Sequence, residues 1–265
     1  MASSATIDGQ RFRRRRGGSF SYLLPALILV VLFFVVPVLM LLMRSVLEPQ
    51  PGLQNYVTLL GSTTYLKIFI NTFTVAGVVT FISILIGYPV AWLLAIMPQR
   101  WSRLVLAIII LSMWTNLLAR TYAWMVLLQR TGVINKSLMA VGLIDTPLPL
   151  VNNLVGVTIG MTYIMLPFVI LPLMGVIRSI DPAVLRAAAL CGANRLQCFV
   201  RVLLPLSLPG IAAGALMVFV MSLGYFVTPA LLGGTSNMML AELVAQFVQS
   251  LVNWGMGGAV ALVLL

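Results

Sequence analysis

The chain has 265 residues, of which 61% are hydrophobic and 8% are charged, and its mean hydropathy is +1.10. A soluble domain carries about 25% charged residues, so this composition excludes a water-soluble globule and indicates a membrane protein. The net charge of +11 comes from 16 basic and 5 acidic residues, which raises the question of which side of the membrane carries them.

The composition also excludes most enzyme chemistries. Histidine is absent, which removes His-based acid–base catalysis and the usual zinc ligand sets. The acidic residues are far apart in the sequence, and Cys191 and Cys198 lack the CxxC spacing of a redox or zinc pair. A Walker-type phosphate loop is also missing from the sequence. We therefore expect no enzyme activity, no metal site and no cofactor bound by this chain.

Apolar runs predict membrane-spanning helices, each of which needs about 20 residues. The first run is Tyr22–Met43, which follows an arginine-rich tail. It is longer than a signal-peptide core and no small-residue cleavage site follows it, so we interpret it as an uncleaved span. The second run predicts a helix over Thr72–Ile96. A third begins after Arg103 and reaches about Leu128, with Arg120 inside it.

The fourth predicted span is Leu154–Ile177, whose internal prolines predict a kink. A fifth runs from about Leu206 to Val227. The last segment, Leu243–Leu265, is uncharged but begins with several polar residues and glycines. Its strongly apolar part, Ala259–Leu265, is too short to cross a membrane. Either this span is poor or the chain stops in the middle of it.

The basic residues predict the orientation of these spans. With six spans and the N-terminus inside, the inner segments carry eleven basic residues and the outer segments five, as the positive-inside rule requires. We therefore expect a multi-pass protein with a basic cytoplasmic tail over residues 1–20 that contacts no nucleic acid. The inner residues are Arg11, Arg13, Arg14, Arg15, Arg16, Arg100, Arg103, Arg178, Arg186, Arg195 and Arg201, and the outer residues are Arg44, Lys67, Arg120, Arg130 and Lys136.

The inner loop between the fourth and fifth predicted spans has helix signals of its own. Asp181 can cap a helix, and Pro182 fits the first helical position. Gly192 is placed to end that helix. Arg195–Leu203 then predicts a second short amphipathic helix that stops at Pro205. Two interpretations stay open: a connector on the membrane surface, or a docking element for a cytoplasmic partner.

This loop, residues 178–205, also carries a motif. Arg186-Ala187-Ala188 is followed after three residues by Gly192 and, after nine more, by Val202-x-Leu204-Pro205. The spacing resembles the EAA loop of binding-protein-dependent ABC importer permeases, which implies that the loop contacts an ATPase subunit. The residues that would make or shape this contact are Asp181, Arg186, Ala187, Ala188, Gly192, Ala193, Leu204 and Pro205.

One position departs from the family's pattern, because Arg186 stands where the family has a glutamate. A cation cannot keep a salt bridge that a carboxylate makes. Two outcomes stay open: the partner ATPase compensates for the change, or the coupling itself is altered.

Further segments resemble spermidine/putrescine-type permeases, so that the resemblance covers roughly residues 20–260. These segments are Asn71–Phe73, Ile86–Pro89, Arg120–Trp124, Ile159–Phe168 and Gly224–Gly234. The resemblance implies an all-α type I ABC importer transmembrane domain over residues 21–265, with about six transmembrane helices and a cytoplasmic coupling helix pair. It also implies that the last span begins near Gly255. We therefore expect that this helix is truncated and that the intact protein is longer.

The function implied by the resemblance is that of a permease subunit of an ATP-driven importer in a bacterial inner membrane. The implied solute is small and is expected to be a polyamine such as putrescine or spermidine. The implied partners are a second and different permease subunit, two ATPase subunits that hold ATP and Mg²⁺, and a periplasmic solute-binding protein. An ion-coupled secondary transporter and a membrane scaffold without transport remain as alternatives.

Polar and aromatic groups near or within the predicted spans are candidates for the solute pathway. Aromatic faces and a carboxylate suit an amine through cation–π and ionic contacts. Each Tyr or Trp could instead anchor a helix at the membrane interface. The candidates are Asn116, Tyr122, Trp124, Tyr163, Tyr225 and Glu242.

Two pairs of glycines at four-residue spacing predict close helix packing. They are Gly156 with Gly160 and Gly210 with Gly214. Packing within the subunit is the favoured interpretation, and contact between subunits stays open.

Overall fold

The computed structural model describes residues 19–265, so the tail arginines lie outside the described residues. Within residues 19–265 the chain is helical and contains no strand. The α-helices are α1 Ser19–Val30, α2 Val36–Leu47, α3 Gln54–Gly61, α4 Thr63–Ile96, α5 Gln99–Trp114, α6 Leu117–Leu128, α7 Val133–Ala140, α8 Leu154–Ser179, α9 Pro182–Leu190, α10 Arg195–Cys198, α11 Leu204–Leu223, α12 Val227–Leu232, α13 Leu240–Ala245 and α14 Trp254–Leu264. The remaining helical turns are the π-helical Val31–Val35, Phe199–Leu203 and Gln246–Ser250, and the 3-10-helical Thr235–Asn237.

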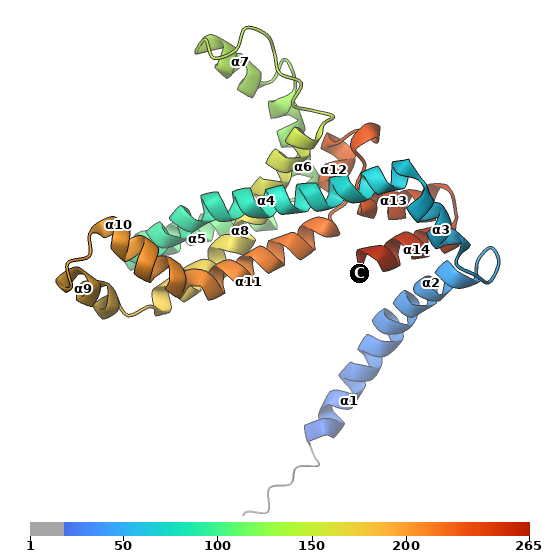
Figure 1. Cartoon of the computed structure of the whole chain (residues 1–265), viewed down its shortest axis with the longest axis horizontal. Helices are drawn as coiled ribbons and strands as arrows, with labels where there is room; N and C mark the ends of the chain where they lie inside the picture. The colour runs from blue at the N-terminus through green and yellow to red at the C-terminus, as the bar shows by residue number, and fades with distance from the viewer. Residues whose placement is uncertain (1–18) are drawn as a thin grey trace, which may run out of the picture.

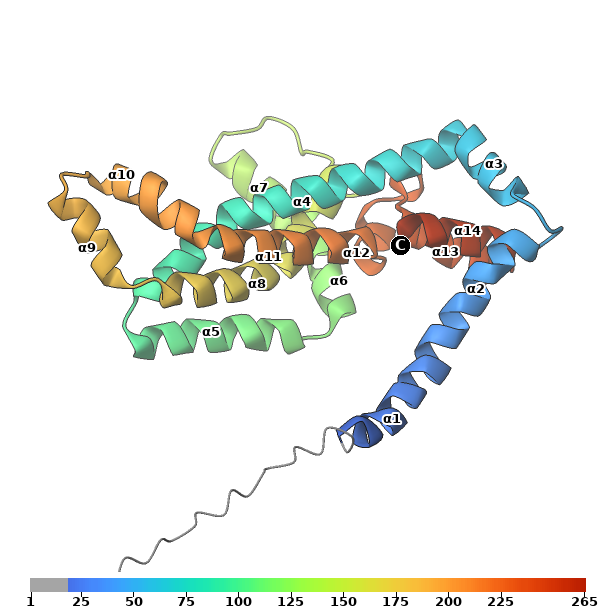
Figure 2. The same cartoon turned by 60° about the horizontal axis from the view of Figure 1, so that its bottom comes forward.

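Three long helices, α4, α8 and α11, pack against one another and form the core (Figures 1 and 2). A stripe of α8 residues at four-residue spacing is fully buried, as expected for one face of a helix. The stripe consists of Met161, Met165, Val169 and Leu173. The core therefore fixes the positions of the segments that join these helices at their ends.

Glycines allow the core helices to approach closely. A β-carbon added at Gly210 or Gly214 would lie 3.1 Å from a backbone Cα of α8, that of Leu173 or Val169 respectively. At Gly160 the added atom would lie 2.7 Å from a methyl group of Leu232 on α12. The glycine contacts are thus made within the subunit, as the favoured interpretation predicts.

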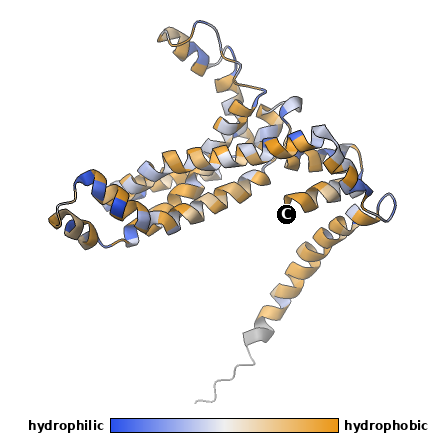
Figure 3. Ribbon diagram, viewed as in Figure 1, coloured by the Kyte–Doolittle hydropathy of each residue, from blue (hydrophilic) through white to orange (hydrophobic). Residues whose placement is uncertain are grey.

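Four helical segments are long and apolar enough to cross a membrane: Leu23–Leu47, Thr63–Ile96, Leu154–Ser179 and Arg195–Leu223. They correspond to the first, second, fourth and fifth predicted spans. Apolar residues dominate these segments, and the most hydrophilic residues gather near their ends (Figure 3).

The third predicted span is wrong as a single helix. The structure has two helical segments, Gln99–Trp114 and Leu117–Ala140, which meet at an angle of 97°. The side chain of Asn116 explains the break, because it accepts a hydrogen bond from the backbone N–H of Leu118 at 2.8 Å and so begins a new helix.

The expectation that Pro205 stops a helix is also wrong. Helix α10, the π-helical turn and α11 continue as one segment, Arg195–Leu223. Pro205 lies in the first turn of α11, directly after the π-helical turn Phe199–Leu203. A helical proline removes a backbone hydrogen bond, and here it follows a turn in which the regular bonding pattern is already interrupted.

The last helix, α14, begins at Trp254, next to the predicted start at Gly255. The side chain of Asn253 caps it, and the helix packs against α2. The approach is close, because a β-carbon added at Gly258 would lie 2.5 Å from the carbonyl oxygen of Leu41. The α2–α14 pair stands beside the core rather than within it (Figure 1).

We predict that Gly214→Val destabilises the protein by about 1–3 kcal/mol, because overpacking against the α8 backbone forces the two core helices apart. The matched control is Gly77→Val, since a β-carbon at Gly77 meets no atom within 4 Å. Thermal unfolding in detergent measures both variants. Equal midpoints for Gly214→Val and Gly77→Val would contradict the close α8–α11 contact.

Candidate functional site

The first helix of the 178–205 loop forms as its sequence signals predict. The carboxylate of Asp181 accepts a hydrogen bond from the backbone N–H of Ala183 at 2.8 Å, and Pro182 occupies the first helical position of α9. The helix is followed by Gly192, whose φ of +84° is costly for residues with a β-carbon. The chain therefore turns sharply after α9 and reverses into α10.

A second cap, which sequence reasoning missed, starts α10. The side chain of Asn194 accepts from the backbone N–H of Gln197 at 2.8 Å, and the Gln197 side chain accepts from the backbone N–H of Asn194 at 2.9 Å. This is a reciprocal capping box. The Asn-x-x-Gln spacing was the signal that could have found it. The turn between α9 and α10 is thus fixed by local hydrogen bonds on both sides.

The helix pair α9–α10 projects from one end of the helical core (Figure 1). On this pair, Leu190 is 89% exposed and Leu196 is 70% exposed. Of the predicted contact residues, Ala188, Ala193 and Leu204 are half-buried. The others are exposed: Asp181, Arg186, Ala187, Gly192 and Pro205. The structure therefore leaves most of this set accessible to another protein.

A single arginine side chain ties the base of the loop to two other helices. Arg178, at the end of α8, donates from Nη2 to the carbonyl oxygen of Leu94 at 3.1 Å and also to the hydroxyl of Ser102. The Ser102 hydroxyl donates to the same Leu94 carbonyl at 2.9 Å, and Ser102 is fully buried. The ends of α8 and α4 and the start of α5 are therefore held together. Sequence reasoning counted Arg178 only as an inner-side charge.

The returning arm of the loop is attached separately. Phe199 packs edge-on against the ring of Tyr88 on α4, with ring centroids 5.6 Å apart. The hydroxyl of Tyr88 lies 3.1 Å from that of Ser207 on α11. Both arms of the loop thus contact α4, so α9 and α10 are held to the core at both ends of the loop.

Two of the predicted pathway residues meet. Trp124 on α6 and Tyr163 on α8 have ring centroids 5.5 Å apart, and the Tyr163 hydroxyl lies 3.2 Å from that of Ser112. Both rings line a cavity of about 280 Å³ between α4, α6 and α8, whose other lining residues are Ile82, Ile86, Thr158, Ile159, Thr162 and Leu166. The sequence identified both residues as pathway candidates, but it could not predict that their rings are in contact.

Tyr225 lines a different cavity, of about 150 Å³, together with Arg120. The Nε atom of Arg120 is buried and has no hydrogen-bond partner in the described part of the chain. The other lining residues are Met113, Leu117, Ile164, Phe168 and Met221. Arg120 therefore borders a partly open cavity with its Nε atom buried.

The remaining pathway candidates do not join either cavity. Asn116 caps α6, as described above, and Tyr122 is 52% exposed on the same helix. Glu242 lies in α13, where its Oε2 atom is buried without a partner among the described residues. The structure thus brings together only part of the predicted set.

Four helical segments that are long and apolar enough to cross a membrane, with an exposed helix pair between two of them, define a membrane-embedded protein. Residues 58–265 match the family described as binding-protein-dependent transport system inner membrane component. The chain belongs to this family.

Similar proteins agree on this class. The chain is 34% identical over 243 residues to the spermidine/putrescine transport system permease protein of Escherichia coli (strain K12), covering 89% of this chain and 88% of that protein. It is 36% identical over 210 residues to the permease of the same name from Haemophilus influenzae, covering 79% and 73%.

The fold is shared with a bacterial alginate ABC transporter solved in complex with an alginate pentasaccharide-bound periplasmic protein. The TM-score is 0.74 at 20% identity, over 92% of this chain and 87% of that one. The protein is therefore a permease subunit of an ABC importer, a multi-pass inner-membrane transport component and not an enzyme.

We predict that Arg178→Gln loosens the ends of α4 and α5, because hydrogen bonds to a charged group contribute roughly 1.5–3 kcal/mol. Hydrogen exchange of backbone amides in residues 94–103 should accelerate. Arg186→Gln is the matched control, since Arg186 is an exposed arginine of the same loop. The same exchange rates in both variants would show that Arg178 does not hold these helix ends.

Proposed function

We propose that this permease imports a polyamine or a closely related small amine. The observation that carries the proposal is its similarity to spermidine/putrescine permeases along nearly the whole of both chains. The paired rings of Trp124 and Tyr163 support it, because aromatic faces attract cations with about 0.5–2 kcal/mol. The cavity at Arg120 is a poor site for such a solute, since its guanidinium repels an ammonium group.

The chain would act within a larger assembly. A second, different permease subunit would complete the pathway, two ATPase subunits would hold ATP and Mg²⁺, and a solute-binding protein would deliver solute from outside. Segment Leu23–Leu47 leaves room for the second permease subunit, because none of its most apolar window is buried. Phe33 and Phe34 on it are 72% and 67% exposed.

The N-terminus would lie in the cytoplasm, on the same side as the 178–205 loop. The basic residues support this orientation, because six of them belong to the loop or to the start of α5, which Arg178 joins to the loop. Positive charge of this kind favours the cytoplasmic side. These residues are Arg100, Arg103, Arg178, Arg186, Arg195 and Arg201.

The loop would transmit the energy of ATP hydrolysis. Helix α9 would dock in a groove of the ATPase through its small and apolar residues, and closure of the ATPase pair would displace it. The contacts of Arg178 and of Phe199 would carry that displacement to α4, α8 and α11. Rigid-body motion of packed helices would then switch the pathway between its inward-open and outward-open forms.

Membership of the family favours ATP-driven import over the two alternatives that the sequence left open, ion-coupled transport and scaffolding. The test is uptake of radiolabelled putrescine and spermidine into proteoliposomes that contain the assembled transporter. We expect uptake that requires ATP on the side of the membrane that carries the ATPase subunits. It should also require the solute-binding protein on the opposite side. Uptake driven by an ion gradient without ATP, or no uptake of either amine, would contradict the proposal.

Arg186 occupies a contact position in this proposal, so reversing its charge should alter coupling. We predict that Arg186→Glu changes the ATPase rate stimulated by the solute-binding protein by about tenfold or more, since charge reversal across a protein contact costs more than 1.4 kcal/mol. Membrane insertion, measured by the yield of folded protein, should stay normal. The control is Arg195→Glu, also exposed in the loop. Unchanged transport in Arg186→Glu would exclude a coupling role for this residue.

A further inference from the structure

A groove of about 260 Å³, the α2–α14 groove, lies between the last turns of α2 and the start of α14. These two helices pack side by side next to the core (Figure 1). One wall is a stripe of α2 residues at the spacing of a single helix face, and the other wall is an indole ring. The lining residues are Pro37, Met40, Leu41 and Arg44 on α2 and Trp254 on α14.

The α2–α14 groove lies where a membrane-spanning segment reaches the lipid headgroups. Segment Leu23–Leu47 is long and apolar enough to cross the membrane. Arg44 follows Leu23 by 21 positions without an intervening charge, which corresponds to roughly 30 Å of helix and so to the hydrocarbon thickness of a bilayer. The guanidinium therefore lies near the headgroups, where tryptophans such as Trp254 are also enriched. In the proposed orientation this is the outer leaflet.

Two opposite charges stand at the mouth of the groove. The Nε atom of Arg44 lies 3.8 Å from Oε1 of Glu48, and both side chains are about half exposed. This separation is longer than a hydrogen bond, so both groups remain open to a further partner. The guanidinium also lies over the ring of Trp254, 5.5 Å from its centroid. The indole therefore orients the cation without neutralising its charge.

Neighbouring contacts hold the two walls in place. Asn55 on α3 donates from Nδ2 to the carbonyl oxygen of Ser45 at 2.8 Å and to that of Glu48 at 2.7 Å. A β-carbon added at Gly255, next to Trp254, would lie 2.6 Å from the same Glu48 oxygen. The end of α2 and the start of α14 are thus in direct contact. The groove is preformed, which lowers the entropic cost of binding.

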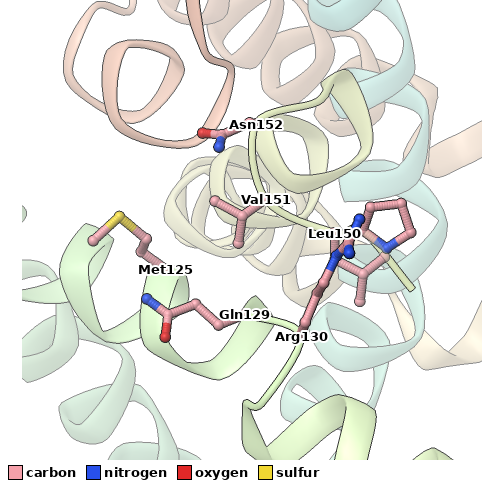
Figure 4. Close-up of a pocket in the computed structure, with 7 residues that line it drawn as sticks. Met125, Gln129, Arg130, Leu150, Val151 and Asn152 are labelled. Carbon is pink, nitrogen blue, oxygen red and sulfur yellow. The ribbon is translucent and has the colours of Figure 1, made fainter. Parts of the chain in front are cut away.

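A second and larger cleft lacks this pairing of charges. It measures about 570 Å³ and holds the guanidinium of Arg130 beside Leu150 (Figure 4). Its lining residues include no acidic side chain: they are Met125, Gln129, Arg130, Pro149, Leu150, Val151 and Asn152. Arg130 attracts anions in general, whereas the pair of Arg44 with Glu48 favours a ligand that carries both charges.

We propose that the α2–α14 groove binds a phospholipid with a zwitterionic amine headgroup, of the phosphatidylethanolamine type. The phosphate pairs with Arg44, the ammonium pairs with Glu48, and an acyl chain lies along the apolar stripe of α2. Two carbons separate the charges of this headgroup, so it can reach two side chains that already adjoin each other.

Charge selects this occupant over the other ligands that could enter. Glu48 would repel an anionic lipid, and Arg44 would repel a polyamine. A soluble phosphate would leave the apolar stripe uncovered. The proposal requires that Leu23–Leu47 crosses the bilayer, and it is independent of the solute that is transported.

The test is photo-cross-linking of the assembled transporter in proteoliposomes made of equal parts phosphatidylethanolamine and phosphatidylglycerol. A cross-linker is attached at Met40→Cys, after Cys191→Ser and Cys198→Ser remove the free thiols of this chain. Mass spectrometry of the labelled peptide identifies its adducts. The matched control is Leu39→Cys, which is 52% exposed and lies on a different face of α2. We expect the ratio of phosphatidylethanolamine to phosphatidylglycerol adducts to be about fivefold higher at Met40→Cys.

Charge variants test the two pairings separately. Glu48→Gln should abolish most of this preference, because the ammonium loses its partner, and Arg44→Gln should reduce the adducts of both lipids at Met40→Cys. Arg130→Gln, which removes an exposed arginine outside the groove, should change neither. Equal lipid ratios at the two label positions would overturn the proposal. So would an unchanged ratio in Glu48→Gln, or an adduct of Met40→Cys with another membrane subunit alone.

Discussion

The guanidinium of Arg178 joins three helix ends, and the position of the 178–205 loop depends on it. Its two hydrogen bonds reach the last turn of α4 and the first turn of α5. The buried hydroxyl of Ser102 donates a third hydrogen bond, to the carbonyl oxygen of Leu94. Charge-assisted hydrogen bonds at a partly buried site are stronger than neutral ones. Because α8 leads directly into α9, a displacement of the loop acts on this contact as well as on the contact of Phe199 with Tyr88.

The core gives that contact its rigidity. Glycines at 210 and 214 bring α11 against the backbone of α8, so the two arms of the loop emerge from closely packed helices. Close packing of this kind gives low compressibility and transmits strain. One closely packed core therefore supports both arms of the 178–205 loop.

The sequence predicted the features that depend on near neighbours. Asp181 and Gly192 act on their own backbone, so the limits of α9 could be predicted from local signals. The break at Asn116 was missed because hydropathy averages over a whole span and does not register one capping side chain. The contact of Arg178 with Ser102 joins residues 76 positions apart, and no local pattern encodes it. The contact between the rings of Trp124 and Tyr163 likewise joins two separate helices, so no local sequence pattern encodes it.

The most direct test of this coupling is a distance measurement between spin labels at Ala183→Cys in α9 and Arg100→Cys in α5, in the assembled transporter with and without ATP. We expect this distance to change by less than about 2 Å while the ATPase subunits close, because the loop and the ends of α4 and α5 move as one body. A larger change, with α9 moving while α5 stays in place, would contradict transmission through the Arg178 contact.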